Sequence, residues 1–322
     1  MANIRLSLAP VHASAQRGVA LAMVLWFIAA MAILVAAITA TARSDVRQAQ
    51  QQLAHVEATA LAQGGQVLLL NEALQLHQQG RYSGRGIWQG DYLLAGHTLQ
   101  ARMIPVTGLI DLNLASRQLL ADMLHYAGEM NAEDADQLAQ RMIEWRQDGG
   151  RTTQADQADR PSRHGRFEVP EDMLLVAGMT RQRYERIAPL VHATHHGQRG
   201  IDWQSAPVGV LAVLTRGDRH RAAELADQRQ SELMQARHVT EQGVPMELTA
   251  QHLGRGASQV YLVEVVLQRM DGNRFQQRSW LELADTAEGR LPWRVIRTEP
   301  VRVRVGPKRP PHEPPIESTT TP

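Results

Sequence analysis

The most informative stretch of this chain is Gln16-Arg17-Gly18-Val19-Ala20-Leu21-Ala22-Met23-Val24-Leu25-Trp26-Phe27-Ile28, where a short basic leader meets an apolar run. The run continues without a charged residue to Ala42. A helix needs about 20 apolar residues to cross a bilayer, so this run is long enough to span one. It is longer than the apolar region of an ordinary secretory signal, which has about 7–15 residues. The sequence therefore predicts an N-terminal membrane helix that includes Val19, Met23, Trp26, Phe27 and Ala42.

The junction between the leader and the apolar run resembles the class III signal of prepilins and pseudopilins. In that signal the leader is cut in front of the apolar run, so the run stays on the mature protein. Here the cut would fall between Gly18 and Val19. Two other interpretations stay open, because Ala40-Thr41-Ala42 looks like the small-residue site of a cleaved Sec signal and the run could also be a plain signal anchor.

The charges of the leader predict the orientation of the helix. Arg5 and Arg17 precede the apolar run, and no acidic residue accompanies them. Positive charge beside a span favours the cytoplasmic side, so we expect a cytoplasmic N-terminus and a single pass through a bacterial inner membrane. The residues after 43 are then expected in the periplasm.

The composition limits the class of protein. A length of 322 residues allows two modest folded units with appendages, and 43% hydrophobic residues allow a core. The formal net charge of +1 gives no electrostatic reason to expect nucleic acid as a partner. The absence of cysteine excludes disulfides, cysteine zinc sites and a cysteine nucleophile.

The helical pattern continues beyond the apolar run to Gln79, without a proline. Apolar residues recur there at intervals of three, four and seven, at Leu53, Val56, Ala60, Val67 and Leu70. This spacing is typical of an amphipathic helix that packs on a soluble domain. One nearly continuous helix from Val19 would be roughly 90 Å long at 1.5 Å per residue. Gly64-Gly65 is the expected position of a kink.

The rest of the chain reads as strands, then helices, then strands again. We expect strands at residues 88–94, 98–106, 261–267, 274–283 and 293–297. We expect helices after Ser116, over Asp134–Arg146, and in a pair at Pro170–Ala177 and Thr180–Val191, with caps at Gly178 and Thr180. The proline-rich tail from Gly306 is expected to be disordered.

An internal echo flanks the helical stretch. Ile110–Ser116 aligns without a gap with Ile201–Pro207, and an apolar helix is expected after each. Leu119, Leu120 and Met123 after the first segment match Val210, Leu211 and Leu214 after the second. The sequence therefore predicts two similar strand-to-helix connections around one helical insert.

Together these segments resemble the K-type minor pseudopilins of type II secretion, the general secretion pathway protein K family. The resemblance covers the Gly18/Val19 junction, residues 108–116, 167–191 and 201–214, and the closing β hairpin. The stretch Phe167-Glu168-Val169-Pro170-Glu171-Asp172-Met173-Leu174-Leu175-Val176-Ala177-Gly178-Met179-Thr180 is close to the one that precedes the second helical pair of the family. The order of these segments is more specific than any one of them.

Met23 stands at the fifth mature position, where most pilins and pseudopilins carry glutamate. A carboxylate inside the membrane is costly unless it is paired, and in a growing pilus this glutamate is thought to pair with the amino terminus of the subunit above. A subunit at the tip has none above it, and the K-type family lacks the acid. The alternative is that Met23 is one more apolar residue of the span.

The resemblance implies an α+β fold, with a long N-terminal transmembrane helix and a pilin-like α/β domain whose antiparallel sheet is interrupted by a large all-helical insert. The expected parts are a leader at 1–18, a transmembrane and pilin helix at 19–80, β domain parts at 81–112 and 240–302, the helical insert at 113–239, and a disordered tail at 303–322.

The resemblance also implies processing, partners and a function. Prepilin peptidase would cut after Gly18 and methylate the new amine of Val19. The expected partners are the I-type and J-type minor pseudopilins, the major pseudopilin and the inner-membrane assembly platform, and no nucleic acid. The expected role is non-enzymatic, namely to cap or initiate the periplasmic pseudopilus that drives export of folded proteins across the outer membrane.

Relatives in this family usually carry Asp-Trp-x-Asp-x-Asp and a long acidic loop that helps to bind calcium. The matching stretch here is Glu144-Trp145-Arg146-Gln147-Asp148, with Arg146 at a usual acid position. Calcium takes six to eight oxygen ligands, and some could come from Asp148, Asp156, Asp159 and Glu168. Because arginines lie among these acids, a solvated polar loop stays the alternative.

Other chemistry has little support in the sequence. The spacing of His192, His195 and His196 fits no zinc-protease motif, and no nucleophile or phosphate-loop motif occurs. The block Leu174–Val191 resembles a helix-hairpin-helix, in which Arg181, Arg183 and Arg186 could meet phosphate. The alternative function is therefore a signal-anchored periplasmic module of the competence type that binds DNA.

Overall fold

The structure is a computed structural model. It describes residues 15–80, 82, 84–147, 165–194, 197–235, 244–256, 258–268, 273–283 and 291–305. The chain forms two compact units, residues 1–57 and residues 58–322. Helix α1 (Ala15–Gln78) begins in the first unit and ends in the second.

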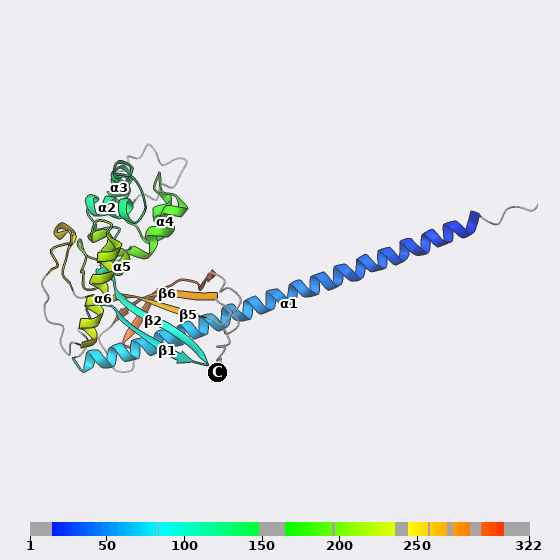
Figure 1. Ribbon diagram of the computed structural model, residues 1–322, viewed down its shortest axis with the longest axis horizontal. Coiled ribbons are helices and arrows are strands. Elements are labelled where there is room, and N and C mark those ends of the chain that lie inside the picture. Colours follow the sequence, from blue (N-terminus) through cyan, green and yellow to red (C-terminus); the bar gives the residue numbers. More distant parts are fainter. Residues whose placement is uncertain are drawn as a thin grey trace, which may run out of the picture. The chain divides into compact units, whose positions relative to one another are not determined.

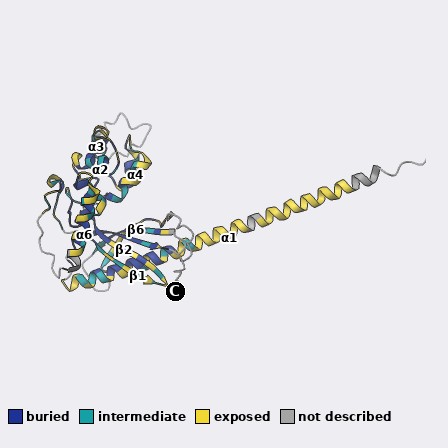
Figure 2. Ribbon diagram, viewed as in Figure 1, coloured by how far each residue is buried: buried dark blue, intermediate teal, exposed yellow. Residues whose placement is uncertain are grey.

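The first unit contains the apolar part of α1. Its described side chains from Leu21 to Glu57 are exposed, except that of Ala54, which is half-buried (Figure 2). α1 is the one described helix that is long and apolar enough to cross a membrane. A signal sequence near an N-terminus would meet the same two criteria.

The second unit is built on an antiparallel sheet of six strands (Figure 1). The strand order is β1-β2-β5-β6-β7. β8 lies outside this order and also pairs with β6. The strands are β1 (Trp88–Leu94), β2 (His97–Pro105), β5 (Val260–Gln268), β6 (Asn273–Leu283), β7 (Trp293–Thr298) and β8 (Arg302–Val305). Ala95 and Gly96 join β1 to β2 with φ values of 50° and 81°, which gives the two-residue turn that matches the twist of a hairpin.

The last part of α1 covers one face of this sheet. A stripe of buried residues runs along it at helical spacing: Ala58, Leu61, Ala62, Gly65, Gln66, Leu69, Leu70 and Ala73. These residues meet the inward side chains of β2, β5 and β6, including Leu99, Val265 and Leu281, in one hydrophobic cluster. The sheet and the helix therefore bury each other's apolar faces.

The predicted stripe on this helix was mostly wrong. Val56 and Val67 are 65% and 48% exposed, and of the five residues named above only Leu70 is buried. The real contact face is rich in alanine and glycine, because small side chains let the helix approach the sheet closely. α1 is also continuous through Gly64-Gly65, and Gly65 lies directly over Leu99 and Val265.

The insert occupies the chain between β2 and β5, which are neighbours in the sheet. Its helices are η1 (Val106–Gly108), α2 (Arg117–Tyr126), α3 (Ala132–Gln147), η3 (Pro170–Leu175), α4 (Arg181–Ile187), η4 (Ala188–Leu190), α5 (Val208–Leu214), α6 (Arg219–Gln235) and η5 (Ala250–His252). It also contains a short parallel pair, β3 (Ile110–Asp111) and β4 (Val191–His192), so it is not purely helical.

Local sequence signals account for the helix starts of the insert. Ser116 and Thr180 cap α2 and α4, because their side-chain oxygens accept hydrogen bonds from the backbone N–H groups of Leu119 and Arg183. Gly178 has a φ of +94° in the turn before α4, which a residue with a Cβ rarely adopts. The predicted helices at these places are confirmed, although the segment at Pro170–Leu175 is a 3₁₀-helix.

The insert shares its core with the sheet. Ile104, Leu262 and Trp280 lie on the face opposite α1 and belong to the same hydrophobic cluster as the buried residues of α2, α3 and α5. The boundaries expected at 112/113 and 239/240 therefore do not separate two independent cores.

The α+β fold class, with one long apolar helix and an antiparallel sheet, is confirmed. One strand was missed, since residues 303–305 were assigned to the tail but belong to β8. The sequence Arg302-Val303-Arg304-Val305 does alternate, but it is short and leads directly into prolines, which concealed the signal. Residues 306–322 lie outside the described part of the chain.

The close contact at Gly65 predicts the effect of a large side chain there. A Cβ at this position would lie 3.2 Å from both Leu99 Cδ1 and Val265 Cγ1, so the larger side chain of Gly65→Leu would displace these neighbours and overpack the contact. We expect a loss of about 1–3 kcal/mol in the free energy of unfolding, measured by urea titration of the full-length chain in detergent. Ala60→Leu, at an exposed position of the same helix, should change it by less than about 0.5 kcal/mol. Equal effects of the two changes would contradict this packing.

Candidate functional site

The residues predicted for processing and membrane insertion lie on α1. Gly18, Val19 and Ala42 are in the helix, but their side chains lie outside the described part. Met23 and Trp26 are 69% and 76% exposed, and Phe27 is 62% exposed. A continuous apolar surface of this kind is stable in lipid rather than in water, so the first unit is the candidate anchor.

The predicted calcium site falls mostly outside the described residues. Asp148, Asp156 and Asp159 are among the residues that are not described, and so are His195 and His196. Glu168 is described and exposed. Within the described ranges no group of three His, Asp or Glu side chains is placed to hold a metal ion. Calcium binding therefore stays a prediction.

Arg146, which stands at a usual acid position, has a structural role of its own. It is half-buried, and its guanidinium donates hydrogen bonds to the backbone oxygens of Leu112 and Ala115, at 3.0 and 2.8 Å. These carbonyls belong to the first connecting loop, residues 112–116, which leads from β3 into α2. Burial lowers the pKa of Arg146, while nearby Asp111 raises it. The arginine thus satisfies carbonyls that would otherwise lack donors.

The second connecting loop, residues 203–207, is held in the same way. Arg229 of α6 donates from Nη1 to the backbone oxygens of Trp203 and Ala206, both at 2.8 Å. In the predicted echo, Trp203 and Ala206 align with Leu112 and Ala115. Burial lowers the pKa of Arg229 to about 10, a value at which the side chain is still charged at neutral pH. The internal repeat therefore includes an arginine that donates hydrogen bonds to two backbone oxygens of each connecting loop. We call Arg146 and Arg229 the arginine clamps.

Each loop also begins in a similar way. Asp111 accepts hydrogen bonds on Oδ1 from the backbone N–H groups of Asn113 and Leu114, at 2.7 and 3.1 Å. Asp202 accepts a hydrogen bond from the Ser205 hydroxyl, at 2.9 Å. Each segment also forms parallel β pairing, at β3 with β4 and at the Ile201–Leu253 bridge. The two halves of the insert are thus built on one local plan.

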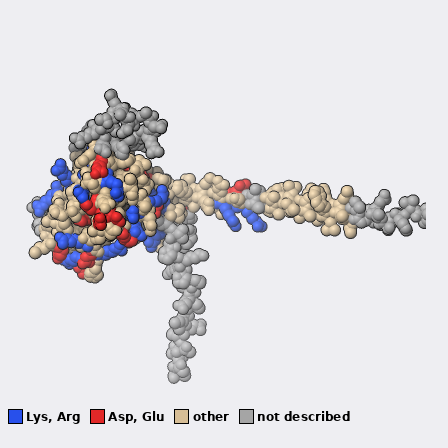
Figure 3. Space-filling model, turned by 90° about the horizontal axis from the view of Figure 1, so that it is seen from above, with Lys and Arg blue, Asp and Glu red and all other residues tan. Residues whose placement is uncertain are grey.

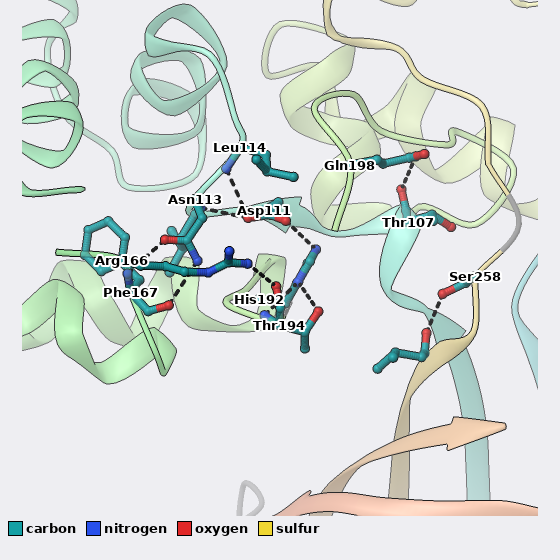
Figure 4. A network of polar contacts seen from close by, with 12 residues as sticks. Thr107, Asp111, Asn113, Leu114, Arg166, Phe167, His192, Thr194, Gln198 and Ser258 are labelled. Carbon is teal, nitrogen blue, oxygen red and sulfur yellow. Dashed lines mark hydrogen bonds and ion pairs between the residues drawn. The ribbon is translucent and has the colours of Figure 1, made fainter. Parts of the chain in front are cut away.

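A buried pair lies where β3 meets β4 (Figure 4). His192 Nε2 is 4.0 Å from Asp111 Oδ2, and His192 Nδ1 accepts a hydrogen bond from the N–H of Thr194 at 3.3 Å. Asp111 Oδ2 has no hydrogen-bond partner among the described residues. Arg166 donates to the backbone oxygen of Thr194 at 3.2 Å, which places its charge close to the pair.

The surroundings of this pair set its protonation. Burial and, to a smaller extent, the charge of Arg166 lower the pKa of His192 to about 3, so the ring is neutral at physiological pH. Burial raises the pKa of Asp111, although its two backbone hydrogen bonds and nearby arginines oppose that rise. The exposed fractions of Asp111 and His192 are only 2% and 1%, so neither is accessible to a substrate. The two side chains lie buried beside the backbone pairing that joins β3 to β4.

The hairpin between η3 and α4 does not present free arginines. Arg181 pairs with Glu185 at 3.2 Å, Arg183 donates to the backbone oxygen of Gly178, and Arg186 pairs with Glu129 at 2.8 Å. Figure 3 shows basic and acidic side chains mixed over the face of the second unit that is in view. Neither observation favours the DNA-binding alternative.

No protein-family model and no curated protein matches the chain. Chains of solved structures do match. One of them is a chain of the crystal structure of the GspK–GspI–GspJ complex from the enterotoxigenic Escherichia coli type 2 secretion system, with a TM-score of 0.48 and 14% sequence identity. The similarity covers 79% of this chain and 98% of that chain.

The two arginine clamps were not found from the sequence. Arg146 lies 31 residues beyond Ala115, whereas Arg229 lies 23 residues beyond Ala206, so an ungapped alignment cannot pair them. A gapped comparison of the helices after each loop could have found them.

Removal of the second clamp should destabilise the insert. Arg229→Met keeps the length of the side chain but leaves the carbonyls of Trp203 and Ala206 without their donor. We expect a loss of about 2–3 kcal/mol in the free energy of unfolding, measured by urea titration of the full-length chain in detergent. Arg219→Met is the matched control, because Arg219 is 76% exposed on the same helix and should cost less than about 1 kcal/mol. A loss at Arg229 no larger than the control would contradict the clamp.

The lowered pKa of His192 predicts a dependence of stability on pH. Because the folded pKa is about 3 and the unfolded pKa about 6.5, the unfolded state binds more protons between these values. This contribution to stability is therefore complete above pH 6.5 and is lost as the pH falls. The raised pKa of Asp111 has the opposite effect on stability, because at low pH the folded state takes up this proton more readily than the unfolded state does.

The test compares the wild type with His192→Gln, which removes the titrating group. Between pH 6.5 and pH 5 the wild type should lose about 1.5 kcal/mol of unfolding free energy more than the variant does. His220→Gln should follow the wild type, because the side chain of His220 is 86% exposed. Parallel curves for the wild type and His192→Gln would show that His192 is not buried as a neutral ring.

Proposed function

We propose that this chain is a minor pseudopilin of a type II secretion system. It is anchored in the bacterial inner membrane and caps or initiates the periplasmic pseudopilus that drives export of folded proteins. The observation that carries the proposal is α1, because a single helix holds both the apolar run and the stripe that packs on the sheet. In this proposal the apolar run stays on the mature protein as the first part of α1 and is not removed with the leader.

The same helix supports the proposed position of the cut. A Sec-type cut after Ala42 would divide α1 and discard its apolar part. A cut between Gly18 and Val19 removes only the first turn of the helix and the basic leader. The second site preserves an anchor, and the arginines before it favour a cytoplasmic N-terminus. Methylation of the new amine of Val19 belongs to this proposal.

The place at the tip is supported by Met23 and by the insert. The apolar run has no acid that would need a partner in a subunit above it. The insert, which lies between β2 and β5 in the sequence, adds a large helical body to the domain. A body of this size would obstruct a further subunit on that side, which suits the last member of a filament and not a repeating one.

The partners belong to the same proposal. The expected neighbours are the I-type and J-type minor pseudopilins, then the major pseudopilin and the inner-membrane assembly platform. The test is co-purification of the full-length chain with tagged I-type and J-type subunits from detergent-solubilised membranes. Failure of both subunits to associate would argue against a place in a tip complex.

Processing offers a direct test of the leader. Gly18→Leu should block the peptidase, because a bulky residue replaces the glycine next to the bond that is cut. Intact-mass analysis should then find the variant beginning at its original N-terminus and the wild type beginning at Val19. Met23→Leu is the control and should be processed normally, since it changes the apolar run without changing the junction. A native chain that begins near Arg43 would overturn the proposal.

A further inference from the structure

Helix α1 carries a pair of arginines directly after its apolar run. Arg43 and Arg47 are four residues apart and both are exposed, so they lie on one face of the helix, about one turn apart. Asp45 stands between them in the sequence but about 200° around the helix axis from Arg43. In Figure 3 the basic side chains on this part of α1 lie on one side of the helix and the acidic ones on the other.

The length of the apolar run places this pair at a membrane surface. The run from Val19 to Ala42 is about 36 Å long at 1.5 Å per residue, and the hydrocarbon core of a bilayer is about 30 Å thick. Thr39 does not interrupt it, because its hydroxyl donates hydrogen bonds to two backbone oxygens of the preceding turn, at 2.9 and 3.0 Å. Arg43 and Arg47 follow about 1.5 and 7.5 Å beyond the run, within a headgroup layer that is roughly 5–8 Å thick.

The direction of the two side chains favours contact with lipid. Side chains on an α-helix lean toward its N-terminus, and the membrane lies on the N-terminal side of Arg43 and Arg47. Both guanidinium groups therefore reach back toward the headgroups. A guanidinium presents five N–H donors in a planar fork that matches the oxygens of a phosphate. The pair thus suits the phosphate groups of phospholipids.

Removal of the leader makes the charge of this helix one-sided. Arg5 and Arg17 leave with the leader when the cut falls after Gly18, and the mature helix keeps an amine at one end and the arginine pair at the other. Sliding the helix inward would carry the pair into hydrocarbon, which is costly, whereas sliding it outward carries the pair into water. The pair therefore opposes one direction of movement far more than the other.

We propose that Arg43 and Arg47 bind the headgroup phosphates of anionic phospholipids at the outer face of the membrane. This contact holds the mature helix at its periplasmic end and stops it from sliding inward, while release outward stays open. The inference rests on the proposed anchor, because it needs the apolar run on the mature protein. It adds a lipid-binding pair, and it adds a direction, since a subunit leaves the bilayer outward when it joins a filament.

The lipid preference of the full-length chain tests the role of the two charges. Native mass spectrometry from detergent micelles with equal amounts of phosphatidylglycerol and phosphatidylcholine gives the ratio of the two lipids that stay bound. We expect phosphatidylglycerol to be preferred, and Arg43→Gln combined with Arg47→Gln to lower the ratio about tenfold, because each arginine beside an anionic surface strengthens binding several-fold. Arg43→Lys combined with Arg47→Lys keeps both charges and should retain most of the preference.

Two controls separate this pair from other charges of the chain. Asp45→Asn changes the same stretch on the opposite face and should not lower the ratio. Arg216→Gln combined with Arg219→Gln removes two exposed arginines from the second unit and should leave the ratio unchanged. An unchanged ratio in the doubly substituted Gln variant of Arg43 and Arg47, or an equal loss in the control pair, overturns the proposal.

A depth measurement tests the direction of movement. The chain has no cysteine, so a single cysteine introduced at exposed Gln50 can carry a spin label. In vesicles of phosphatidylglycerol and phosphatidylcholine, the collision rate of the label with a water-soluble relaxing agent reports its distance from the lipid. The label should lie closer to the lipid in the double Gln variant than in the wild type, because inward sliding is no longer opposed. No shift, or a shift into water, contradicts the stop.

Failure of this inference is distinguishable from failure of the proposed function. An unchanged lipid ratio together with lost co-purification of the I-type and J-type subunits would assign Arg43 and Arg47 to acidic groups of a partner, which overturns the lipid contact and leaves the anchor in place. A native chain that begins near Arg43 would remove the anchor itself, and intact-mass analysis detects that before any lipid is added.

Discussion

Two guanidinium groups, that of half-buried Arg146 and that of buried Arg229, fix the turns on which the insert is built. Where each connecting loop leaves a strand and enters a helix, its carbonyls point into a dry interior, and buried carbonyls need donors. Arg146 and Arg229 supply them from helices that come later in the chain. Each contact therefore joins the beginning of a half of the insert to a later helix of the same half. The lowered pKa values of both arginines reflect the burial that this arrangement requires.

Features with a local cause were predicted well from the sequence. The strands show alternation, the helices show apolar spacing, and Ser116 and Thr180 are side chains that cap helices. The echo was visible because its two segments align without a gap. Features that depend on distant contacts were not predicted. The clamps join residues far apart in the chain. The contact face of α1 combines leucines with alanines and a glycine, and which side of the helix is buried depends on the sheet that it packs against.

The candidate site was predicted unevenly for the same physical reason. An apolar run beside a basic leader is a property of consecutive residues, so the long apolar helix that contains Met23, Trp26 and Phe27 could be predicted from composition and length alone. A pocket, such as the one beside the second connecting loop, is assembled from distant segments. Arg85, Gln204 and Arg255 line it and come from three parts of the chain, and no spacing rule connects them. Arg146 could be noticed in the sequence, because it departs from the calcium motif. Its structural role, hydrogen bonding to loop carbonyls, became visible only from its contacts.

The position of the insert has a consequence for the order of folding. β2 and β5 are adjacent and pair from Leu99 with Leu267 to Pro105 with Tyr261, yet residues 106–259 separate them in the chain. Closing a loop of that length costs conformational entropy, and a collapsed insert with neighbouring ends reduces this cost. During synthesis the hairpin of β1 and β2 emerges long before its central partner strand. Until the insert has folded, the apolar side of that hairpin and the stripe of α1 have only each other for cover, so the partly synthesised chain exposes apolar surface that is prone to aggregation.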